Sequence, residues 1–548
     1  MADEETHAGG GEQASHACSA CKKQKRKCDK KLPRCSLCSR MSRECSYADP
    51  TVPPEDSLQV LQSRIAELEA LLVLKNCQVE QQQQNSQVTR PHQRANPSAR
   101  LLNADPFQQF PALFFLDHEM FREARLSIPV PTPLVPDEIY RMLGNIDGLI
   151  SIAERFFATT HVWFPILSKK RFEIMLNNSD FAPSPDQALL FSAMHLITDD
   201  GSNCRNSGQT NAYWSIKNFA FALEANAVMT PQLLQANVLI ATYEIGHAVY
   251  PAAYLTVGRC AMLGKAYGLD NRKDAPQMLR RYGAWAEQEE LRRLWWAILL
   301  LDRYVHLGVR GHALTTEDPF HNEVLPAEDS QFDHAEMVSS EPLYVGSPTS
   351  LKAGPFARAC QAAHLVGKVV SVLNDLDRET ENRFNTALQI HRTLSAFVQV
   401  VQAEFARSSE EFATPMALAY SALIALCDPF CCTDTNRGAH TVEETDLQTV
   451  CISGMKTVSN DIARFASHLR PSMTLRPAAI SPLIANCLYM ATSTFAWRVY
   501  EGESPATLDA YKLLRDALSA VNGRWATGGE YLLGVDKARE LLYPSSLL

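Results

Sequence analysis

A regular series of six cysteines constrains the folding of this 548-residue chain more than any other feature. The cysteines follow the spacing Cys-x2-Cys-x6-Cys-x6-Cys-x2-Cys-x6-Cys and are Cys18, Cys21, Cys28, Cys35, Cys38 and Cys45. Zn²⁺ prefers four tetrahedral ligands, and a structural site takes them largely from thiolates. One ion would leave two cysteines unused, whereas two separate ions would need eight ligands. Six thiolates therefore close two zinc sites only if two sulfurs are shared between the ions.

The same segment has few apolar side chains, so we expect metal binding and folding to be a single event. The alternative is three disulfides, which are typical of small secreted proteins. Residues 1–17 are polar and acidic, without the apolar stretch of a signal peptide, and we predict a disordered tail there. The spacing and this context favour zinc over disulfides.

The cysteine-rich module at residues 18–47 is strongly basic within an acidic chain. It holds ten Lys and Arg residues against Asp29 and Glu44, whereas the whole chain has a net charge of −9. The densest run is Lys22, Lys23, Gln24, Lys25, Arg26 and Lys27. A basic run is usually only a solvated surface, and it can double as a nuclear import signal. On a rigid metal-bound module it favours a polyanionic partner, and double-stranded DNA fits best.

These residues resemble the fungal Zn(II)2Cys6 binuclear cluster transcription factors. The likeness rests on the cysteine series, the basic residues after Cys21, the acidic Asp29 after the third cysteine, and Pro33 two residues before the fourth. It implies that Cys18 and Cys35 bridge the two zinc ions. It also implies a protein of the nucleus that regulates transcription by RNA polymerase II.

The resemblance also suggests how DNA would be read. A first helix carrying Lys22 to Arg26 would enter the major groove, with Lys25 at the usual base-reading position. A lysine that reaches guanine O6 and N7 fits the CGG triplets read by the family. Gln24 departs from the family pattern, in which a second basic residue is common there, so we expect altered backbone affinity or a shifted triplet.

A short heptad pattern follows the proline-containing linker that we place at residues 48–57. Leu58, Leu61, Ile65, Leu68 and Leu72 recur at steps of three and four, and Lys75 and Val79 continue the series. We predict a coiled-coil dimerisation segment at residues 58–80. The alternative is an amphipathic helix docked on its own chain, because the segment is short for an independent coiled coil. Residues 81–135 are rich in Gln, Asn and Pro at their start, and we predict a mostly disordered spacer.

Residues 136–548 are predicted to form a large all-α regulatory domain. Apolar spacing predicts helices at 148–160, 186–198, 231–243, 252–267, 287–305, 358–375, 383–405, 415–426, 447–468, 481–500 and 508–521. The segment Glu287 to Val305 is apolar on both sides, which predicts a central, buried helix. Its charged residues then need partners, and we favour a structural ion-pair network over a ligand site for Arg292, Arg293, Asp302 and Arg303.

Part of this domain resembles the fungal-specific transcription factor domain. The matching text, between Ile146 and Pro326, includes Phe164-Pro-Ile-Leu167, Thr242-Tyr243-Glu244, Arg292-Arg-Leu-Trp-Trp296 and Leu301-Asp-Arg-Tyr304. The resemblance implies an all-helical domain that binds effectors or partners and restrains activity.

Enzymatic motifs are absent or incomplete, and we predict that the chain is not an enzyme. Glu244-Ile-Gly-His247 lacks the second histidine of a zinc protease helix. Gly258 to Lys265 resembles a phosphate-binding loop, but its glycines are too far apart and Ala266 replaces the Ser or Thr. The cysteines outside the series are expected to be reduced and buried, with a redox or electrophile-binding role for Cys427, Cys431 and Cys432 as the alternative.

Two further expectations concern segments of the large domain. Glu328 to Tyr344 is acidic with interspersed apolar residues; a solvated surface loop is preferred, and an activation segment is the alternative. The longest apolar run that we identify, Leu294 to Leu301, is too short to span a membrane. We expect a soluble, intracellular protein with no membrane partner.

Taken together, the sequence predicts a zinc-dependent, sequence-specific DNA-binding regulator. We expect a homodimer that binds CGG-type half-sites, recruits the transcription machinery and activates a pathway-specific gene set, such as a secondary-metabolite cluster. The alternatives are a metabolite-sensing regulator with a small-molecule effector, a repressor, and a zinc-cluster module that binds protein instead of DNA.

Overall fold

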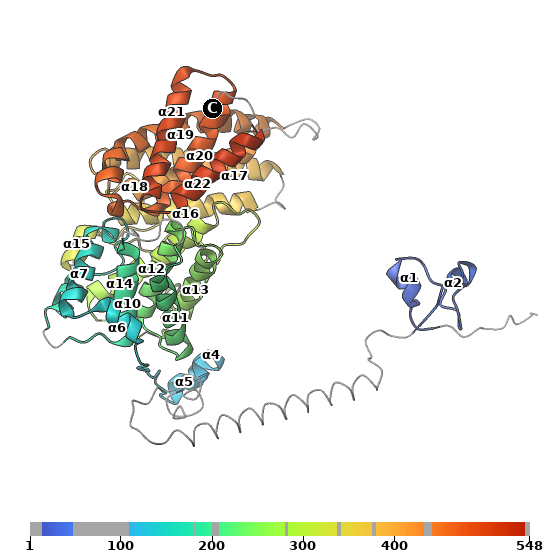
Figure 1. Cartoon of the computed structure of the whole chain (residues 1–548), viewed down its shortest axis with the longest axis horizontal. Helices are drawn as coiled ribbons and strands as arrows, with labels where there is room; N and C mark the ends of the chain where they lie inside the picture. The colour runs from blue at the N-terminus through green and yellow to red at the C-terminus, as the bar shows by residue number, and fades with distance from the viewer. Residues whose placement is uncertain are drawn as a thin grey trace, which may run out of the picture. The chain divides into compact units, whose positions relative to one another are not determined.

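The computed structural model describes residues 14–47, 109–178, 181–199, 208–279, 283–336, 341–374, 380–431 and 441–542. The chain divides into two compact units, Met1–Asn103 and Ala104–Leu548, and each is described by itself (Figure 1). Several sequence predictions lie outside the described residues: the linker at 48–57, the coiled-coil segment at 58–80, and Cys77, Cys204 and Cys432.

In its described residues the small unit has two five-residue helices, α1 (Ser19–Lys23) and α2 (Ser36–Arg40), which repeat one local structure. A cysteine precedes each helix at the N-cap position, Cys18 for α1 and Cys35 for α2. The second cysteine of each CxxC pair lies within the helix and is buried. The repeated spacing in the sequence thus becomes a repeated helix start.

Each helix ends in the same way. The backbone N–H of Arg26 donates to the Cys21 carbonyl at 3.0 Å, and that of Arg43 donates to the Cys38 carbonyl at 3.0 Å. These six-to-one bonds are typical of helix C-termini, and Lys25 accordingly has a left-handed backbone with φ of 51°. The prediction of a helix reaching residue 26 was therefore wrong at its end. A helix that continued from Cys21 to Cys28 would place the third cysteine about 10 Å along the axis from the second.

The large unit is helical. Its helices, in chain order, are α4 (Leu113–Leu116), α5 (His118–Glu123), α6 (Asp137–Leu143), α7 (Ile146–Ala158), α8 (Thr160–Trp163), α9 (Lys169–Leu176), α10 (Pro185–Thr198), α11 (Asn211–Ala225), α12 (Pro231–Gly246), α13 (Ala252–Ala266), α14 (Trp285–Val305), α15 (Asp329–His334), α16 (Pro355–Asn374), α17 (Thr380–Phe405), α18 (Ala413–Cys427), α19 (Val442–Leu475), α20 (Ala485–Tyr500), α21 (Pro505–Asn522) and α22 (Thr527–Leu542), with short 3-10 turns η3 (Asp428–Phe430), η4 (Pro477–Ala479) and η5 (Pro482–Ile484). In the described residues there is no strand, only an isolated antiparallel bridge between Val324 and Tyr344. The all-α prediction is confirmed.

Local signals explain several helix starts. Ser184 and Gln187 form a capping box before α10, and Thr230 caps α12 by accepting the Leu233 N–H at 3.3 Å. Both helices have proline at their first position, where the missing N–H is not needed. Every helix predicted from apolar spacing has a counterpart, whereas α6, α8, α9, α11, α15 and α22 were missed.

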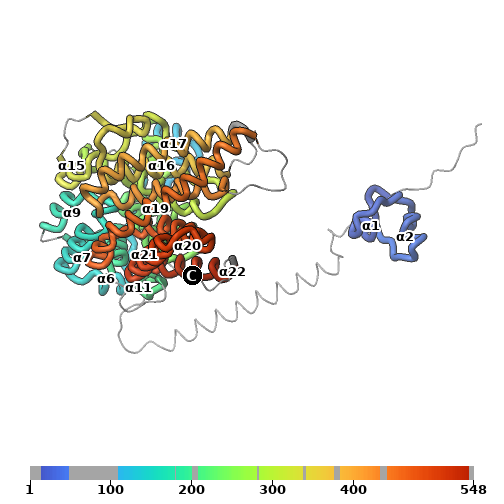
Figure 2. Tube along the Cα trace, turned by 90° about the horizontal axis from the view of Figure 1, so that it is seen from above, coloured from blue at the N-terminus to red at the C-terminus, as the bar shows by residue number. Residues whose placement is uncertain are grey.

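Helix α14 is buried on both sides, as its sequence predicted. It packs against α12, α13 and α16, and α16 in turn packs against α17 and α18. Figure 1 shows α6 to α14 gathered in one part of the unit and α17 to α22 in the other, and Figure 2 gives the view turned by 90°. One continuous apolar core runs through both parts.

Order begins earlier than the predicted spacer allowed. Residues 109–135 were assigned to a mostly disordered segment, yet the structure places α4 and α5 there. Phe114 and Phe121 are buried and meet edge to face, with ring centroids 5.3 Å apart. The aromatic residues of this stretch supply the burial that the preceding polar residues lack.

The membrane prediction needs one correction. The run Ala413–Phe430 is longer and more apolar than the run identified from the sequence, and by length and composition it passes the test for a membrane span. In the structure 83% of this segment is buried inside the protein, where it forms α18 and η3. Its apolar character is accounted for by the core of the large unit.

Candidate metal centre and nucleic-acid interface

The six cysteines of the small unit come together as two overlapping groups. The first is Cys18, Cys21, Cys28 and Cys35, and the second is Cys18, Cys35, Cys38 and Cys45. Within each group every sulfur lies within 4.8 Å of the others. Among the described residues no other group of His, Cys, Asp or Glu has this metal-binding arrangement. Both groups contain Cys18 and Cys35.

The spacing of the sulfurs fits zinc. A tetrahedron of sulfurs with Zn–S bonds of about 2.3 Å has edges of about 3.8 Å. The Cys18 and Cys35 Sγ atoms are 3.8 Å apart, Cys21 and Cys35 are also 3.8 Å apart, and Cys18 and Cys38 are 3.7 Å apart. All six cysteines are free thiols rather than disulfides. The donor set and its dimensions therefore suit shared tetrahedral sites.

The packing of the thiols also affects their protonation. Hydrogen bonding to Cys35, together with burial, raises the pKa of Cys38 to about 12. For Cys28 burial acts to raise the pKa, but hydrogen bonds from the backbone of Cys18 and Lys30 outweigh it and lower the pKa to about 7. Neighbouring thiolates repel one another, so a divalent cation is needed to hold all six sulfurs in the anionic form.

Two side chains support the sulfur cluster from outside. The Asp29 carboxylate accepts the backbone N–H of Ser36 at 3.0 Å and so ties the loop after the third cysteine to the start of α2. Hydrogen bonding from Ser36 lowers the pKa of Asp29. The Tyr47 hydroxyl donates to the Lys31 carbonyl at 3.0 Å and lies 4.0 Å from the Cys28 sulfur. Tyr47 was not predicted; its place two residues after the last cysteine was the only signal.

The basic run lies on the outside of this scaffold. Lys22, Lys23, Gln24, Lys25, Arg26 and Lys27 are all exposed. Gln24 accepts a hydrogen bond from the Arg43 guanidinium, which joins the two halves of the small unit. The residue that departs from the family pattern thus has an internal contact. The cations around it are available to phosphate oxygens, which such residues neutralise in DNA complexes.

The charged residues of α14 form the predicted structural network. Arg293 is fully buried and donates to Glu289 at 3.1 Å, to Asp329 at 2.7 Å and to the Pro165 carbonyl at 3.1 Å. Its guanidinium also lies 4.1 Å from the Phe332 ring centroid. The motifs that resemble the family domain thereby contact one another, because Pro165 belongs to the first and Arg293 to the third.

A second buried group lies near the end of α14. Arg303 donates to Asp302 at 2.7 Å, to the Thr316 carbonyl at 3.1 Å and to Asp318 at 3.2 Å. Asp302 also accepts the backbone N–H of Thr316 at 2.9 Å. These bonds fasten the chain after α14 to that helix, which is a structural role.

The segment Glu328–Tyr344 is not a solvated loop in its described part. Residues 329–334 form α15, Phe332 is buried, and Asp333 accepts a hydrogen bond from His161 at 2.7 Å. The Leu343 carbonyl accepts the Leu325 N–H at 2.8 Å. Buried arginine and histidine partners for its carboxylates explain why an acidic stretch is folded here.

The rejected catalytic motifs have structural roles. Glu244 accepts hydrogen bonds from Lys217 at 2.6 Å and from Tyr213 at 2.8 Å. Burial lowers the pKa of His247 to about 3. Gly258 and Lys265 lie within the continuous helix α13, so no phosphate-binding loop exists there.

The remaining cysteines of the described residues are mostly buried. Cys260, Cys360, Cys451 and Cys487 are buried, as predicted for small apolar side chains. Hydrogen bonding to Cys451, followed by burial, raises the pKa of Cys427 far above its ordinary value. This argues against a reactive thiol at Cys427. Cys431 is half-buried.

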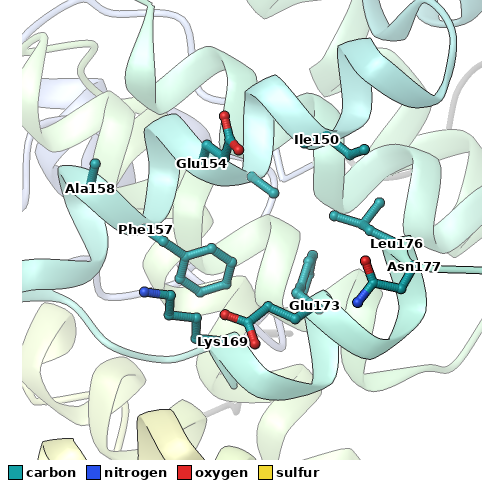
Figure 3. A pocket seen from close by; sticks show the side chains of 10 residues that line it. Ile150, Glu154, Phe157, Ala158, Lys169, Glu173, Leu176 and Asn177 are labelled. Atoms are coloured by element: carbon teal, nitrogen blue, oxygen red, sulfur yellow. The ribbon is translucent and has the colours of Figure 1, made fainter.

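The described part of the large unit has several hollows. One of about 720 Å³ lies between α18, α19 and α20 and is lined mainly by apolar side chains, among them Ile424, Met455, Met490 and Trp497. Another, of about 510 Å³, lies between α7 and α9, where Phe157 reaches toward Lys169 and Glu173 (Figure 3). The first has the size and character of a small-molecule site.

Comparison with protein families matches both units. Residues 16–53 match the fungal Zn(2)-Cys(6) binuclear cluster domain, and residues 153–399 match the fungal specific transcription factor domain. No solved structure matches the chain. A domain of the first kind binds zinc and DNA, which agrees with the sulfur groups and the exposed cations.

Relatives with curated names are transcription factors. Transcription factor BOA15 of Botryotinia fuckeliana is 36% identical over 180 residues, covering 33% of this chain and 98% of that protein. The pigment biosynthesis transcriptional activator pigB of Monascus ruber is 24% identical over 343 residues, covering 59% of this chain and 57% of that protein. The depudecin biosynthesis cluster-specific transcription activator DEP6 of Fusarium langsethiae is 24% identical over 361 residues, covering 54% and 57%. The chain thus spans somewhat more than half of the last two.

Proposed function

This chain belongs to the fungal Zn(2)-Cys(6) binuclear cluster transcription factors, and from that membership we propose that it is a nuclear, pathway-specific activator. It would bind promoter DNA at CGG-type half-sites as a dimer and recruit the RNA polymerase II machinery. The names of the relatives support the kind of pathway, because two of them are activators of biosynthesis. We therefore propose a secondary-metabolite gene cluster as the target.

The sharing of two cysteines between the sulfur groups carries this proposal. Two tetrahedral ions need eight ligand positions, and six thiolates supply them when Cys18 and Cys35 each bind both ions. We propose two Zn²⁺ per chain on that basis. The resulting rigid scaffold would present Lys22, Lys23 and Lys25 to the DNA.

DNA contacts would divide into two kinds. Phosphate contacts from the exposed cations supply affinity that falls steeply with salt, and base contacts supply specificity. Lys25 lies at the left-handed turn directly after α1, so it is displaced from the helix that would enter the groove. We propose that Lys25 contacts guanine from this turn, with Lys22 and Lys23 on phosphates.

Binding of the full chain to duplexes tests the proposal. We expect a duplex with two CGG half-sites to bind more tightly than a scrambled duplex of equal composition, with log affinity falling linearly with log salt. Lys25→Ala should reduce the preference for CGG, whereas Lys23→Ala should weaken both duplexes alike. Equal affinity for both duplexes at every salt concentration would overturn sequence-specific binding and favour a protein-docking role for the module.

Metal content and promoter occupancy test the remaining parts. Metal analysis of the purified chain should give two zinc ions, and one ion would contradict the shared-ligand scheme. Genome-wide occupancy of the tagged protein should concentrate on the promoters of one biosynthetic cluster, with loss of their transcripts when the gene is deleted. Rising transcripts in the deletion strain would indicate a repressor.

Effector binding is a second candidate function, favoured by the apolar hollow between α18, α19 and α20. Ser493 and Thr494 contribute hydroxyl groups to its lining, and Asp428 contributes a carboxylate. An uncharged, mainly apolar molecule with a hydrogen-bond donor would fit this chemistry. The fluorescent probe N-phenyl-1-naphthylamine should bind the full chain, and Ser493→Phe should abolish this binding because the larger side chain fills the hollow. Probe binding that is unaffected by this substitution would exclude the hollow as its site.

A further inference from the structure

Helices α11 and α13 share an outer surface with four large apolar side chains. Trp214 and Phe221 on α11 are 47% and 40% exposed, and Leu255 and Met262 on α13 are 64% and 62% exposed. Both helices also contribute to the core through their opposite sides, for example through the buried Tyr213 and Val257. Each helix is therefore apolar on two sides, but only the side that faces the core is covered by other residues of the unit. We call these four residues, together with Glu224, Gly258 and Arg259, the α11–α13 surface.

This surface is continuous across the two helices. Arg259 lies over the Phe221 ring, with its guanidinium carbon 4.3 Å from the ring centroid. The same guanidinium forms an ion pair with Glu224 at 3.2 Å. Beneath them, Lys217 on α11 donates to Thr256 on α13 at 2.5 Å. The surface thus has apolar residues around one neutralised pair of charges, with the exposed Asn218 between Trp214 and Phe221.

A notch interrupts the apolar row on α13. Leu255, Gly258 and Met262 are spaced by three and four residues, which places them on one face of the helix. A Cβ atom added at Gly258 would meet nothing within 4 Å, so the notch is open to solvent. Gly264 of the same helix contrasts with it, because a Cβ there would lie 2.8 Å from Trp295 in the core. Of these two glycines of α13, only Gly264 is needed for packing inside the unit.

We propose that the α11–α13 surface pairs with the same surface of a second copy of this chain. A two-fold contact requires a surface that complements itself. Here the protruding Leu255 and Met262 flank a notch that the equivalent side chain of another copy can fill. The Arg259–Glu224 pair supplies one charge of each sign, which balances in such a contact. Neither DNA nor a strongly charged protein would find a complementary charge on it.

The residue types also favour a protein interface. Trp, Phe, Met and Arg are enriched in the centres of interfaces, where charged residues other than Arg are scarce. Apolar patches of this kind on a protein surface mark interaction sites. The contact would be independent of the predicted coiled coil at residues 58–80. With both contacts in place, each would raise the effective concentration for the other, and the paired DNA-binding modules would be held together more firmly.

The mass of the full chain in solution tests this pairing. The predicted coiled coil is first disrupted with Leu61→Pro and Leu68→Pro, and the mass is measured by sedimentation over a range of concentrations. We expect this double variant still to dimerise. Adding Gly258→Arg fills the notch with a charged side chain and should weaken the dimer at least about tenfold, which corresponds to about 1.4 kcal/mol. The circular dichroism spectrum should not change and the melting temperature should not fall, because space around Gly258 is open and arginine favours a helix more than glycine does.

Gly308→Arg is the matched control. Gly308 is an exposed glycine at which a Cβ would meet nothing within 4 Å, and it lies after α14 and is not one of the residues of the α11–α13 surface. This variant should dimerise like its parent. A parent that is monomeric at all concentrations, or a dimer that Gly258→Arg and Gly308→Arg affect equally, would overturn the proposal.

Complementary charges show whether the partner is a second copy. A chain with Leu255→Glu and Met262→Glu, and another with Leu255→Lys and Met262→Lys, should each be monomeric in the coiled-coil-disrupted background. Mixing them should restore a dimer with one chain of each kind. A mixture that stays monomeric would contradict self-pairing. So would a Gly258→Arg variant that loses transcription while its mass and promoter occupancy are unchanged, because that result identifies a different protein partner. Mass is measured without DNA, so a failure of the DNA-binding proposal would leave this result intact.

Discussion

The two units of this chain are held together by different physics. In the small unit the buried residues that form the core are cysteines, namely Cys18, Cys21, Cys35 and Cys38. In the large unit the core is apolar and continuous, and its central helix α14 extends over 21 residues with both sides buried. One unit therefore depends on bound metal, and the other depends on burial and packing.

This difference determines where each unit places its charges. The small unit has little interior, so Lys22 to Lys27 are exposed and free to meet DNA phosphates. The large unit buries Arg293, Arg303 and Arg358 at 1% exposure or less, and each has carboxylate partners. Under the proposed function, basic residues serve recognition in one unit and architecture in the other. Mutations should separate the two roles cleanly.

The largest effect is expected from Cys35→Ser, because Cys35 belongs to both sulfur groups. Loss of one shared ligand should release both zinc ions, unfold residues 18–47 and abolish specific DNA binding. The melting temperature of the large unit should stay the same. Zinc analysis, DNA binding and calorimetry on the full chain measure these three results.

Cys431→Ser is the control for this variant, since Cys431 is a half-buried thiol of the large unit. It should retain zinc and DNA binding. Specific DNA binding by zinc-free Cys35→Ser protein would contradict a metal-dependent small unit.

The next largest effect is expected from Arg293→Met, which should destabilise the large unit and leave the small unit unchanged. Removing the guanidinium leaves Glu289 fully buried with one charged partner fewer and leaves the Pro165 carbonyl without its donor. Breaking a buried ion pair in this way costs about 3–5 kcal/mol. Denaturant unfolding of the large unit should show this loss, while zinc content is unchanged.

Arg292→Met provides the matched control on the same helix. Arg292 also pairs with Glu289, but its side chain is 26% exposed. Its loss should cost about 1 kcal/mol or less, because Glu289 keeps the buried Arg293 and the Ala327 N–H as partners and because Arg292 itself is partly exposed to solvent. Equal destabilisation by both variants would show that burial of Arg293 is not what makes it structural.

The sequence predicted the gathering of the six cysteines and the all-α class because both signals are local and periodic. Cysteine spacing encodes the ligand set, and apolar spacing encodes the helices. The pairing of Arg293 with Asp329 was foreseen only as a need for partners, since the partner lies 36 residues away and is chosen by the fold. The end of α1 was misjudged because it depends on bringing Cys28 back to the metal, which is a constraint on three-dimensional closure.

Smaller effects are expected within one helix of the large unit. Gly264→Ala places a Cβ 2.8 Å from the Trp295 ring, and overpacking of this kind costs about 1–3 kcal/mol, partly offset by the better helix propensity of alanine. Gly258→Ala meets no atom and should instead stabilise the helix by about 0.5–1 kcal/mol. Thermal unfolding of both variants tests the contrast, and destabilisation by both would contradict the open notch at Gly258.

The smallest effect on stability is expected when an exposed cation is replaced by alanine. Such replacements in the two units should differ only in their effect on DNA binding. Arg310 pairs with Asp428 at 3.2 Å, but both side chains are more than half exposed, so Arg310→Ala should change the stability of the large unit by less than about 0.5 kcal/mol. Lys23→Ala in the small unit should be equally silent in calorimetry. It should nevertheless reduce the salt dependence of DNA binding by about one unit of slope, because one phosphate contact is lost. An unchanged slope for Lys23→Ala, or a changed slope for Arg310→Ala, would mean that exposure alone does not assign the cations of the small unit to DNA.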